Sequence, residues 1–199
     1  MPELPEVETT RRGIEPHVEG KRITKMVVRE RRLRWPIPAS LEARLAGQTV
    51  DGVERRGKYL LLRIGDGSLI MHLGMSGSLR VLEPGTQQPL KKHDHVELVF
   101  DDNTVLRYHD PRRFGCILWQ DDPVSDHPLI ETLGPEPLDN DFNARALFAR
   151  SRGRKAPIKT FIMDSKVVVG AVSYTHLRAH ETLMNLVCRL LLEKIEWGG

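Results

Sequence analysis

The stretch TVDGVERRGKYLLLRIGDGSLIMHL, residues 49–73, decides the fold. Short runs of β-branched and aliphatic residues alternate here with turn signals, such as the tripeptide GDG at 65–67. Apolar runs of this length, bounded by glycine and aspartate, are typical of antiparallel strands joined by tight turns. The stretch therefore predicts a series of short strands rather than helices.

The same pattern continues to residue 120 through GSLRVLE, HVELVF, TVLRYH and GCILWQ. Seven short strands at this spacing predict an antiparallel sandwich or barrel. Upstream, KRITKMVVRE (21–30) reads as a further strand and LEARLAG (41–47) as a short helix that ends at its glycine.

Helices are expected at the two sides of this β-rich region. Pro5 suits a first helical turn, and Gly13 and Pro16 are expected to end that helix, which gives a helix over 5–14. Residues 121–140 read as a connector, and helical patterns follow in DFNARALFAR and from 156 to 164. The order of elements favours an α+β protein.

The composition is that of a globular domain with a small excess of basic residues. Of 199 residues, 40% are hydrophobic and 29% are charged, and 30 Lys and Arg against 27 Asp and Glu give a net charge of +3. The charged start and the lack of an apolar run of about 18 residues predict a soluble intracellular protein without signal peptide or membrane segment. Cys116 and Cys188 form no CxxC pair, which argues against a disulfide framework or a zinc site within the chain and favours a reducing cytoplasm.

Basic residues gather at five expected turns: RERRLRW (29–35), ERRGKY (54–59), LKKH (90–93), DPRRFG (110–115) and ARSRGRK (149–155). Any one of these clusters is most simply a solvated loop. Five in one chain, two of them with an aromatic residue beside the charge, indicate phosphate contacts combined with stacking or wedging side chains.

Two motifs leave alternatives open. Met75 lies in the glycine-flanked turn HLGMSG (72–77), where it either packs in the core or is presented outward. His93 and His95 alternate in HDH as metal ligands can, but no third ligand stands at a suggestive spacing. We therefore expect one histidine to face a partner and its neighbours to pack or pair.

The first residues carry the equipment for nucleophilic chemistry. Removal of Met1 would expose Pro2 as an N-terminal secondary amine, and α-amino groups titrate near pH 7.7–8.0, far below lysine. An uncharged amine beside an acid, Glu3, can attack an electrophilic carbon and form an iminium ion. The alternative is that both residues merely begin a helix.

Six motifs in this order resemble bacterial formamidopyrimidine-DNA glycosylase, the 8-oxoguanine repair family: PELPEVET, RGKYLL, HLGMSG, KHDHV, LRYHDPRRFG and LGPEPL. The resemblance covers roughly residues 1–170, and PELPE rather than PEGPE argues against the related endonuclease VIII branch. It implies an antiparallel two-sheet β-sandwich with an N-terminal helix, followed by a helical domain with a helix–two-turn–helix and a zinc finger. On this basis we expect a catalytic domain over 1–132 and a linker with the start of the helical domain over 133–170.

The resemblance also implies base-excision repair by a bifunctional glycosylase and abasic-site lyase that acts on oxidised purines, namely 8-oxoguanine and formamidopyrimidines. Pro2 would attack C1′ of the damaged nucleotide and form a Schiff base, and Glu3 would donate the proton that helps to open the sugar. Glu6 would support the site, and Lys58 would contact phosphate and assist β-elimination.

Further residues match family positions that hold the DNA. Met75, Arg112 and Phe114 match the side chains that fill the void left by the extruded nucleotide, and Arg112 would face the orphaned cytosine. His93, Arg112 and Arg154 match DNA-binding positions, with Arg154 standing where lysine is common. The expected partner is damaged double-stranded DNA, bound by a monomer in the bacterial cytoplasm at the nucleoid.

The resemblance stops after SKVVVG (165–170). From about 171 to 195 the chain resembles a translated sequencing adapter, although its apolar spacing also suits a divergent natural helix. We expect a C-terminally truncated sequence with a non-family tail over 171–199, no cofactor in this chain because the structural zinc site of the family would lie beyond residue 199, and impaired turnover. A non-catalytic damaged-DNA or single-strand binding module on the same sandwich is the alternative, but such a module needs neither the amine nor the acid.

Overall fold

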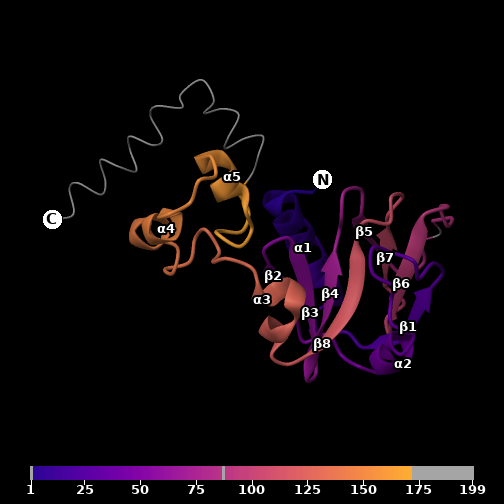
Figure 1. Ribbon diagram of the computed structural model, residues 1–199. Coiled ribbons are helices and arrows are strands. Elements are labelled where there is room, and N and C mark those ends of the chain that lie inside the picture. Colours follow the sequence, from indigo (N-terminus) through magenta and orange to yellow (C-terminus); the bar gives the residue numbers. More distant parts are fainter. Residues whose placement is uncertain (1, 87, 172–199) are drawn as a thin grey trace. The chain divides into compact units, whose positions relative to one another are not determined.

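The computed structural model describes residues 2–86 and 88–171, which fall into two compact units divided between Glu131 and Thr132. The helices and strands of the first unit are α1 (Leu4–Val18), β1 (Ile23–Val28), α2 (Leu41–Leu45), β2 (Gly52–Arg56), β3 (Tyr59–Ile64), β4 (Gly67–His72), β5 (Ser78–Leu82), β6 (Asp94–Phe100), β7 (Val105–His109), β8 (Cys116–Asp121), the 3₁₀ helix η1 (Val124–Asp126) and α3 (Pro128–Glu131). Figure 1 shows them in sequence order. No helix among the described residues is long and apolar enough to cross a bilayer.

The strands form two four-stranded antiparallel sheets. One has the order β1-β6-β7-β5 and the other β2-β3-β4-β8. All seven strands predicted between residues 49 and 120 are present, as is the strand predicted within 21–30, so the α+β class and the antiparallel two-sheet sandwich are confirmed. Short apolar runs separated by turn signals are sufficient to specify these strands because each strand buries a face against the partner sheet.

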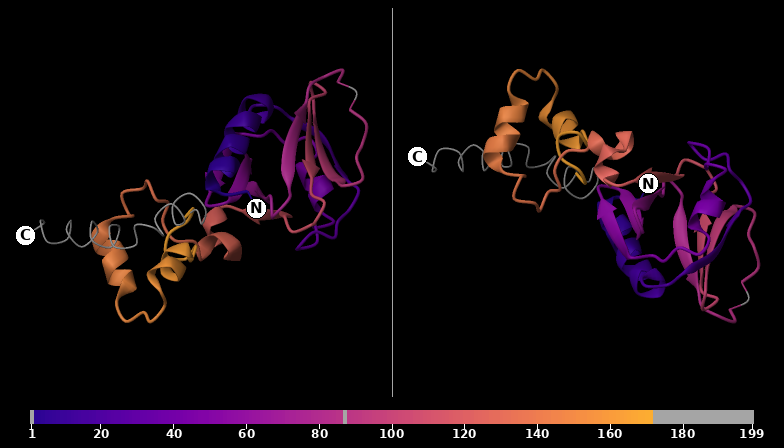
Figure 2. Two further views of the ribbon diagram at one scale, coloured as in Figure 1. Left: turned by 90° about the horizontal axis from the view of Figure 1, so that it is seen from above. Right: turned by 90° about the horizontal axis from the view of Figure 1, so that it is seen from below.

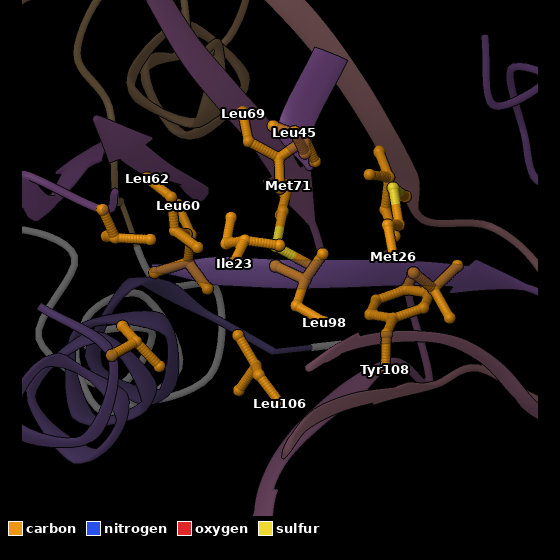
Figure 3. Close-up of a cluster of buried hydrophobic side chains, with 14 of the residues drawn as sticks. Ile23, Met26, Leu45, Leu60, Leu62, Leu69, Met71, Leu98, Leu106 and Tyr108 are labelled. Carbon is orange, nitrogen blue, oxygen red and sulfur yellow. The ribbon is translucent and has the colours of Figure 1, made fainter. Parts of the chain in front are cut away.

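The core lies between the sheets. Leu60, Leu62, Leu69 and Met71 come from the β2-β3-β4-β8 sheet and meet side chains of the other sheet across the layer (Figure 3). The labelled residues of the facing sheet are Ile23, Met26, Leu98, Leu106 and Tyr108. Each of these nine side chains is at most 4% exposed, so deleting one would leave a cavity worth about 2–5 kcal/mol.

The first helix runs further than its sequence signals indicate. Residues 5–14 were the expected span, but α1 continues through Pro16 to Val18. Pro16 removes one helical hydrogen bond, yet Ile14 and Val18 are buried at 3% and 0% exposure, so packing stabilises the last turn. The prediction that Gly13 and Pro16 end the helix was therefore wrong.

Helix α1 is fastened to the sandwich by charge as well as by apolar packing. It contacts β2, β3 and β5 and lies beside the sheets in both views of Figure 2. Glu8 accepts hydrogen bonds from Arg11 and from Arg55 of β2, and Arg11 also donates to the carbonyl of Val53 at 3.1 Å. The hydrogen bond from Arg11, joined by those of Arg12 and Arg55, lowers the pKa of Glu8 from 4.5 to about 2. The residues before the helix are thus carried on a fixed element.

The described part of the second unit contains α4 (Ala144–Ser151) and α5 (Ile158–Met163). The Asn143 side chain caps α4 by accepting from the amide of Ala146 at 3.0 Å. The tail resembling a translated adapter lies, apart from residue 171, outside the described residues.

Candidate functional site

The strand registers bring most of the candidate residues to one end of the sandwich. His72, the last residue of β4, pairs with Tyr59 at the start of β3 and with Cys116 at the start of β8. In the other sheet, His109 at the end of β7 pairs with the starts of β5 and β6. The loops carrying Lys58, Met75, His93 and the DPRRFG turn therefore leave the sandwich at the same end.

The N-terminal end of α1 lies at this end as well (Figure 1). Glu3 is the N-cap residue of α1, and Glu3 and Glu6 form a capping box in which the Glu3 amide donates to Glu6 Oε2 at 2.9 Å. Lys58 Nζ donates to Glu3 Oε2, also at 2.9 Å, and both side chains are about one-fifth exposed. The structure thus joins Lys58 to Glu3, which lies 55 residues earlier in the sequence and is bonded to Glu6, and Pro2 directly precedes Glu3.

His72 is a neutral imidazole at the same place. Its Nδ1 accepts a hydrogen bond from the amide of Gly74 at 3.0 Å, which requires that this nitrogen carry no proton. Burial, together with the nearby charges of Lys58 and Arg34, lowers the pKa of His72 from 6.5 to about 4. Its ring also lies against that of Tyr59, with centroids 4.8 Å apart.

A buried carboxylate holds the two turns at this end together. Asp110 is 0% exposed and accepts hydrogen bonds from Ser76 Oγ at 2.7 Å, the amide of Gly115 at 2.9 Å and the hydroxyl of Tyr108 at 3.2 Å. Ser76 Oγ in turn accepts from the amide of Arg112 at 3.2 Å. One side chain therefore fixes the backbone of the HLGMSG and DPRRFG turns relative to each other.

The two turns also touch directly at a glycine. Gly74 has φ +61°, and a Cβ built on it would lie 2.5 Å from the backbone of Phe114 and of Gly115. Only glycine combines this left-handed conformation with so close an approach of two backbones.

The clamped turns present apolar side chains to solvent. Met75 and Phe114 are each 42% exposed, and the Arg112 guanidinium lies over the Phe114 ring at 4.6 Å. Arg112 itself is exposed. Of the two alternatives for Met75, outward presentation is correct and core packing is wrong.

In the HDH motif, His95 and Asp94 pack and pair within the protein, while the contact of one histidine with a partner stays a prediction. His95 is 5% exposed and its Nε2 lies 2.8 Å from the carbonyl oxygen of Asp110, whereas His93 is half-buried beside it, with ring centroids 6.0 Å apart. Asp94 is buried and bonds to His109 Nδ1 at 2.8 Å. Burial raises the pKa of Asp94, but hydrogen bonds from the Lys91 amide and from His109 outweigh it, so the net shift is downward. Within residues 2–86 and 88–171 no three His, Cys, Asp or Glu side chains are placed to hold a metal ion.

Arg154 belongs to the second unit. It is exposed and follows α4 in the second unit, so the first unit alone does not include it.

Three residues of the site were not singled out from the sequence: His72, Asp110 and Arg34. All three lie inside quoted motifs, but nothing local shows that the His72 ring is buried or that Asp110 bonds across two turns. The Ser76 partner of Asp110 lies 34 residues away, and only the tertiary structure brings it within reach.

Comparison with known proteins places this arrangement in context. Residues 1–117 match the family model described as the formamidopyrimidine-DNA glycosylase N-terminal domain. The formamidopyrimidine-DNA glycosylase of Methylococcus capsulatus is 59% identical over 170 residues, covering 85% of this chain and 62% of that protein. That of Hahella chejuensis is 46% identical, covering 100% of this chain and 80% of the relative.

Solved structures that match this chain are of the same kind of protein. Lactococcus lactis formamidopyrimidine-DNA glycosylase, bound non-covalently to DNA containing an abasic site, matches with a TM-score of 0.78 and 34% identity over 86% of this chain and 66% of that one. A structure of MutM in complex with DNA containing carbocyclic 8-oxoguanine gives the same score. The chain spans about 62% of the length of the first curated relatives it matches.

Proposed function

The chain belongs to the formamidopyrimidine-DNA glycosylase family, and on that premise we propose that it acts in base-excision repair as a glycosylase and abasic-site lyase on oxidised purines in duplex DNA. Residues 1–131 would be the catalytic domain, and the unit that begins at Thr132 would add DNA contacts, among them Arg154. The observation that carries the proposal is the meeting of Glu3, Glu6 and Lys58 at the N-terminal end of α1, directly beside Pro2.

The chemistry would begin at the amine of Pro2 after removal of Met1. The nitrogen attacks C1′ of the damaged nucleotide, the C1′–N bond to the base breaks, and the base leaves with the bonding electrons and takes up a proton. Glu3 protonates the ring oxygen so that the sugar opens and an iminium ion remains. Loss of a proton from C2′ then expels the 3′ phosphate and cleaves the strand, with Lys58 assisting.

The Glu3–Lys58 contact imposes a condition on this sequence. A carboxylate that accepts a hydrogen bond from an ammonium group is not ready to donate a proton. We therefore expect Lys58 to exchange Glu3 for a DNA phosphate when the duplex binds, which frees Glu3 to carry the proton. The distance of 2.9 Å and the partial exposure of both side chains make this exchange sterically simple.

The exposed turns would handle the extruded nucleotide. Extrusion of a base from the stack costs a few kcal/mol. Met75 and Phe114 would fill the vacated space, and Arg112, stacked on Phe114, would face the unpaired cytosine. His93 would contact the backbone nearby.

Borohydride trapping tests the proposal. The chain is incubated with a duplex containing 8-oxoguanine opposite cytosine, and a reduced covalent adduct is expected for the wild type and not for Pro2→Gly. Mass spectrometry of the N-terminus is the control, since a retained Met1 blocks the amine. The same assay on residues 1–170 joined to the remaining part of the Methylococcus capsulatus relative separates missing DNA contacts from a failed nucleophile. No adduct from that chimera would refute the enzymatic proposal.

The second candidate function is a damaged-DNA or single-strand binding module without catalysis. The exposed pair of Arg112 and Phe114 would serve such a module equally well. In that case Glu3→Gln and the wild type would bind abasic-site duplex equally and neither would form an adduct, whereas the enzymatic proposal expects an adduct from the wild type alone.

A further inference from the structure

The basic segment RERRLRW (29–35) lies at the same end of the sandwich, and apart from the effect of Arg34 on the pKa of His72 it has no role in the site described above. It follows β1 and holds four arginines within six residues. Three of them form ion pairs with glutamates of the same unit. The pairs are Arg29–Glu97, Arg31–Glu42 and Arg32–Glu30, with N···O distances of 2.6, 2.5 and 2.8 Å.

Arg34 is the exception. It is exposed and has no carboxylate partner among the described residues, and its guanidinium instead lies over the ring of Trp35 at 5.1 Å. Trp35 is itself 37% exposed. This repeats the arrangement of Arg112 over Phe114, where an arginine without an acid also rests on an exposed aromatic ring. Stacking of this kind orients a guanidinium while its N–H groups stay available to another acceptor.

The segment is docked onto the DPRRFG turn. The amide of Arg34 donates to the carbonyl of Gly115 at 3.1 Å, and Arg113 donates to Glu30 at 3.3 Å. The two Arg–aromatic pairs are therefore carried on one connected backbone assembly rather than on independent loops.

The charge of Arg34 also reaches the catalytic side of that assembly. Both Arg34 and Lys58 act on His72, where they add to burial in lowering its pKa. Arg34 acts in the same way on Cys116, although burial dominates there and raises the thiol pKa to about 12. Arg34, which has no acid among the described residues, adds positive charge beside the His72 ring, and an anion can bind to its free N–H groups.

We propose that Arg34 binds a phosphate of the DNA backbone close to the one that Lys58 contacts, and that Trp35 is a positioning residue that holds the Arg34 guanidinium toward it. The inference rests on the proposed function, because it takes duplex DNA as the ligand. It extends the DNA-contacting surface of the first unit from the β4–β5 and β7–β8 turns to the segment after β1.

Counterion release provides the test. Binding of the full chain to a fluorescent duplex with a tetrahydrofuran abasic analogue opposite cytosine is measured by anisotropy over a series of salt concentrations. Each phosphate contact makes the slope of log Kobs against log[salt] more negative by about 0.9. Arg34→Gln should therefore reduce the magnitude of this slope by about 0.9 and weaken binding about eightfold at 0.1 M salt. Arg34→Lys should keep the slope.

Matched variants separate this contact from a general loss of charge. Arg32→Gln removes the same charge from the same segment, but Arg32 already binds Glu30, so its slope should equal that of the wild type. Trp35→Ala should weaken binding while the slope is kept, and Trp35→Phe should restore the affinity because it restores the aromatic face.

Equal slopes for Arg34→Gln and Arg32→Gln would overturn the inference. Borohydride trapping of Arg34→Gln at saturating protein distinguishes the two proposals, since an adduct together with an unchanged slope refutes only the role of Arg34. If neither the wild type nor the chimera forms an adduct, but Arg34→Gln lowers the magnitude of the slope, the enzymatic proposal is refuted and the phosphate contact of Arg34 is retained. Absence of any salt-dependent binding by the wild type would refute both.

Discussion

Replacement of Asp110 should loosen the assembly that presents Met75 and Phe114. Asp110→Ala removes the acceptor of three hydrogen bonds, from Ser76, Gly115 and Tyr108, at a position that is 0% exposed. Hydrogen bonds to a charged acceptor contribute about 1.5–3 kcal/mol each, which sets an upper range of about 4.5–9 kcal/mol. The Tyr108 hydroxyl keeps the His72 carbonyl at 3.3 Å as a second acceptor. Half-buried Ser76 can turn to water, so we expect a loss of about 3–5 kcal/mol.

The matched variant is Asp110→Asn. Its amide can donate to Ser76 Oγ while its remaining oxygen accepts from Gly115 and Tyr108, so only the charge is lost and the cost should be about 1 kcal/mol. Urea unfolding gives both values. Hydrogen exchange at the Gly115 amide gives a local readout, with protection lost in Asp110→Ala and largely kept in Asp110→Asn.

Two results would refute this reasoning. Equal losses of stability in the two variants would mean that the carboxylate charge, not the hydrogen-bond acceptors, stabilises the turns. Retained protection of the Gly115 amide in Asp110→Ala would mean that the β4–β5 and β7–β8 turns are held together by other contacts.

Three further predictions concern the same end of the sandwich. Gly74→Ala should lower the free energy of unfolding, measured by heat or urea, by at least about 1–3 kcal/mol, because φ is +61° and the added Cβ meets the backbone of Phe114 and Gly115. The control is Gly13→Ala on α1, whose added Cβ meets no atom and which should be neutral or stabilising. The pKa of His72 is about 4 in the folded state against 6.5 in the unfolded state. Its contribution to stability is therefore full above pH 6.5 and is lost as the pH falls toward 4, by up to about 3 kcal/mol. In urea unfolding at a series of pH values, His72→Asn should flatten that part of the stability profile, and an unchanged profile would contradict the buried neutral ring. Met75→Ala and Phe114→Ala should each leave the unfolding free energy within about 0.5 kcal/mol of wild type, since both side chains are 42% exposed. Both variants should bind abasic-site duplex more weakly. A loss of stability of about 2–5 kcal/mol, as for a core truncation, would instead place these side chains in the core.

The strands followed from the sequence because they depend on local information. Short apolar runs and the glycine-bearing turns between them are visible within about ten residues of sequence, and two packed sheets are the simplest way to bury seven such strands. The end of α1 shows where local signals fail. Pro16 reads as a stop, but burial of Ile14 and Val18 outweighs one lost hydrogen bond.

The candidate site could be predicted from the sequence only in part. Residue types and order predicted Pro2, Glu3, Lys58 and the turns at this end as the site, chiefly through the resemblance of their motifs to a known family. They gave no measure of whether Met75 is buried, because the same turn suits a core or an exposed methionine.

The sequence by itself thus determined the strands, the sheet class and the chemical types at the site, since these are properties of short segments. Only the tertiary structure decided that Lys58 bonds to Glu3, that Asp110 joins two turns, and that Arg34, among four neighbouring arginines, has no acid partner within the described part of the chain. The reason is that charge pairing and burial depend on partners tens of residues away, which are chosen by strand register and packing and leave no local trace in the order of residues.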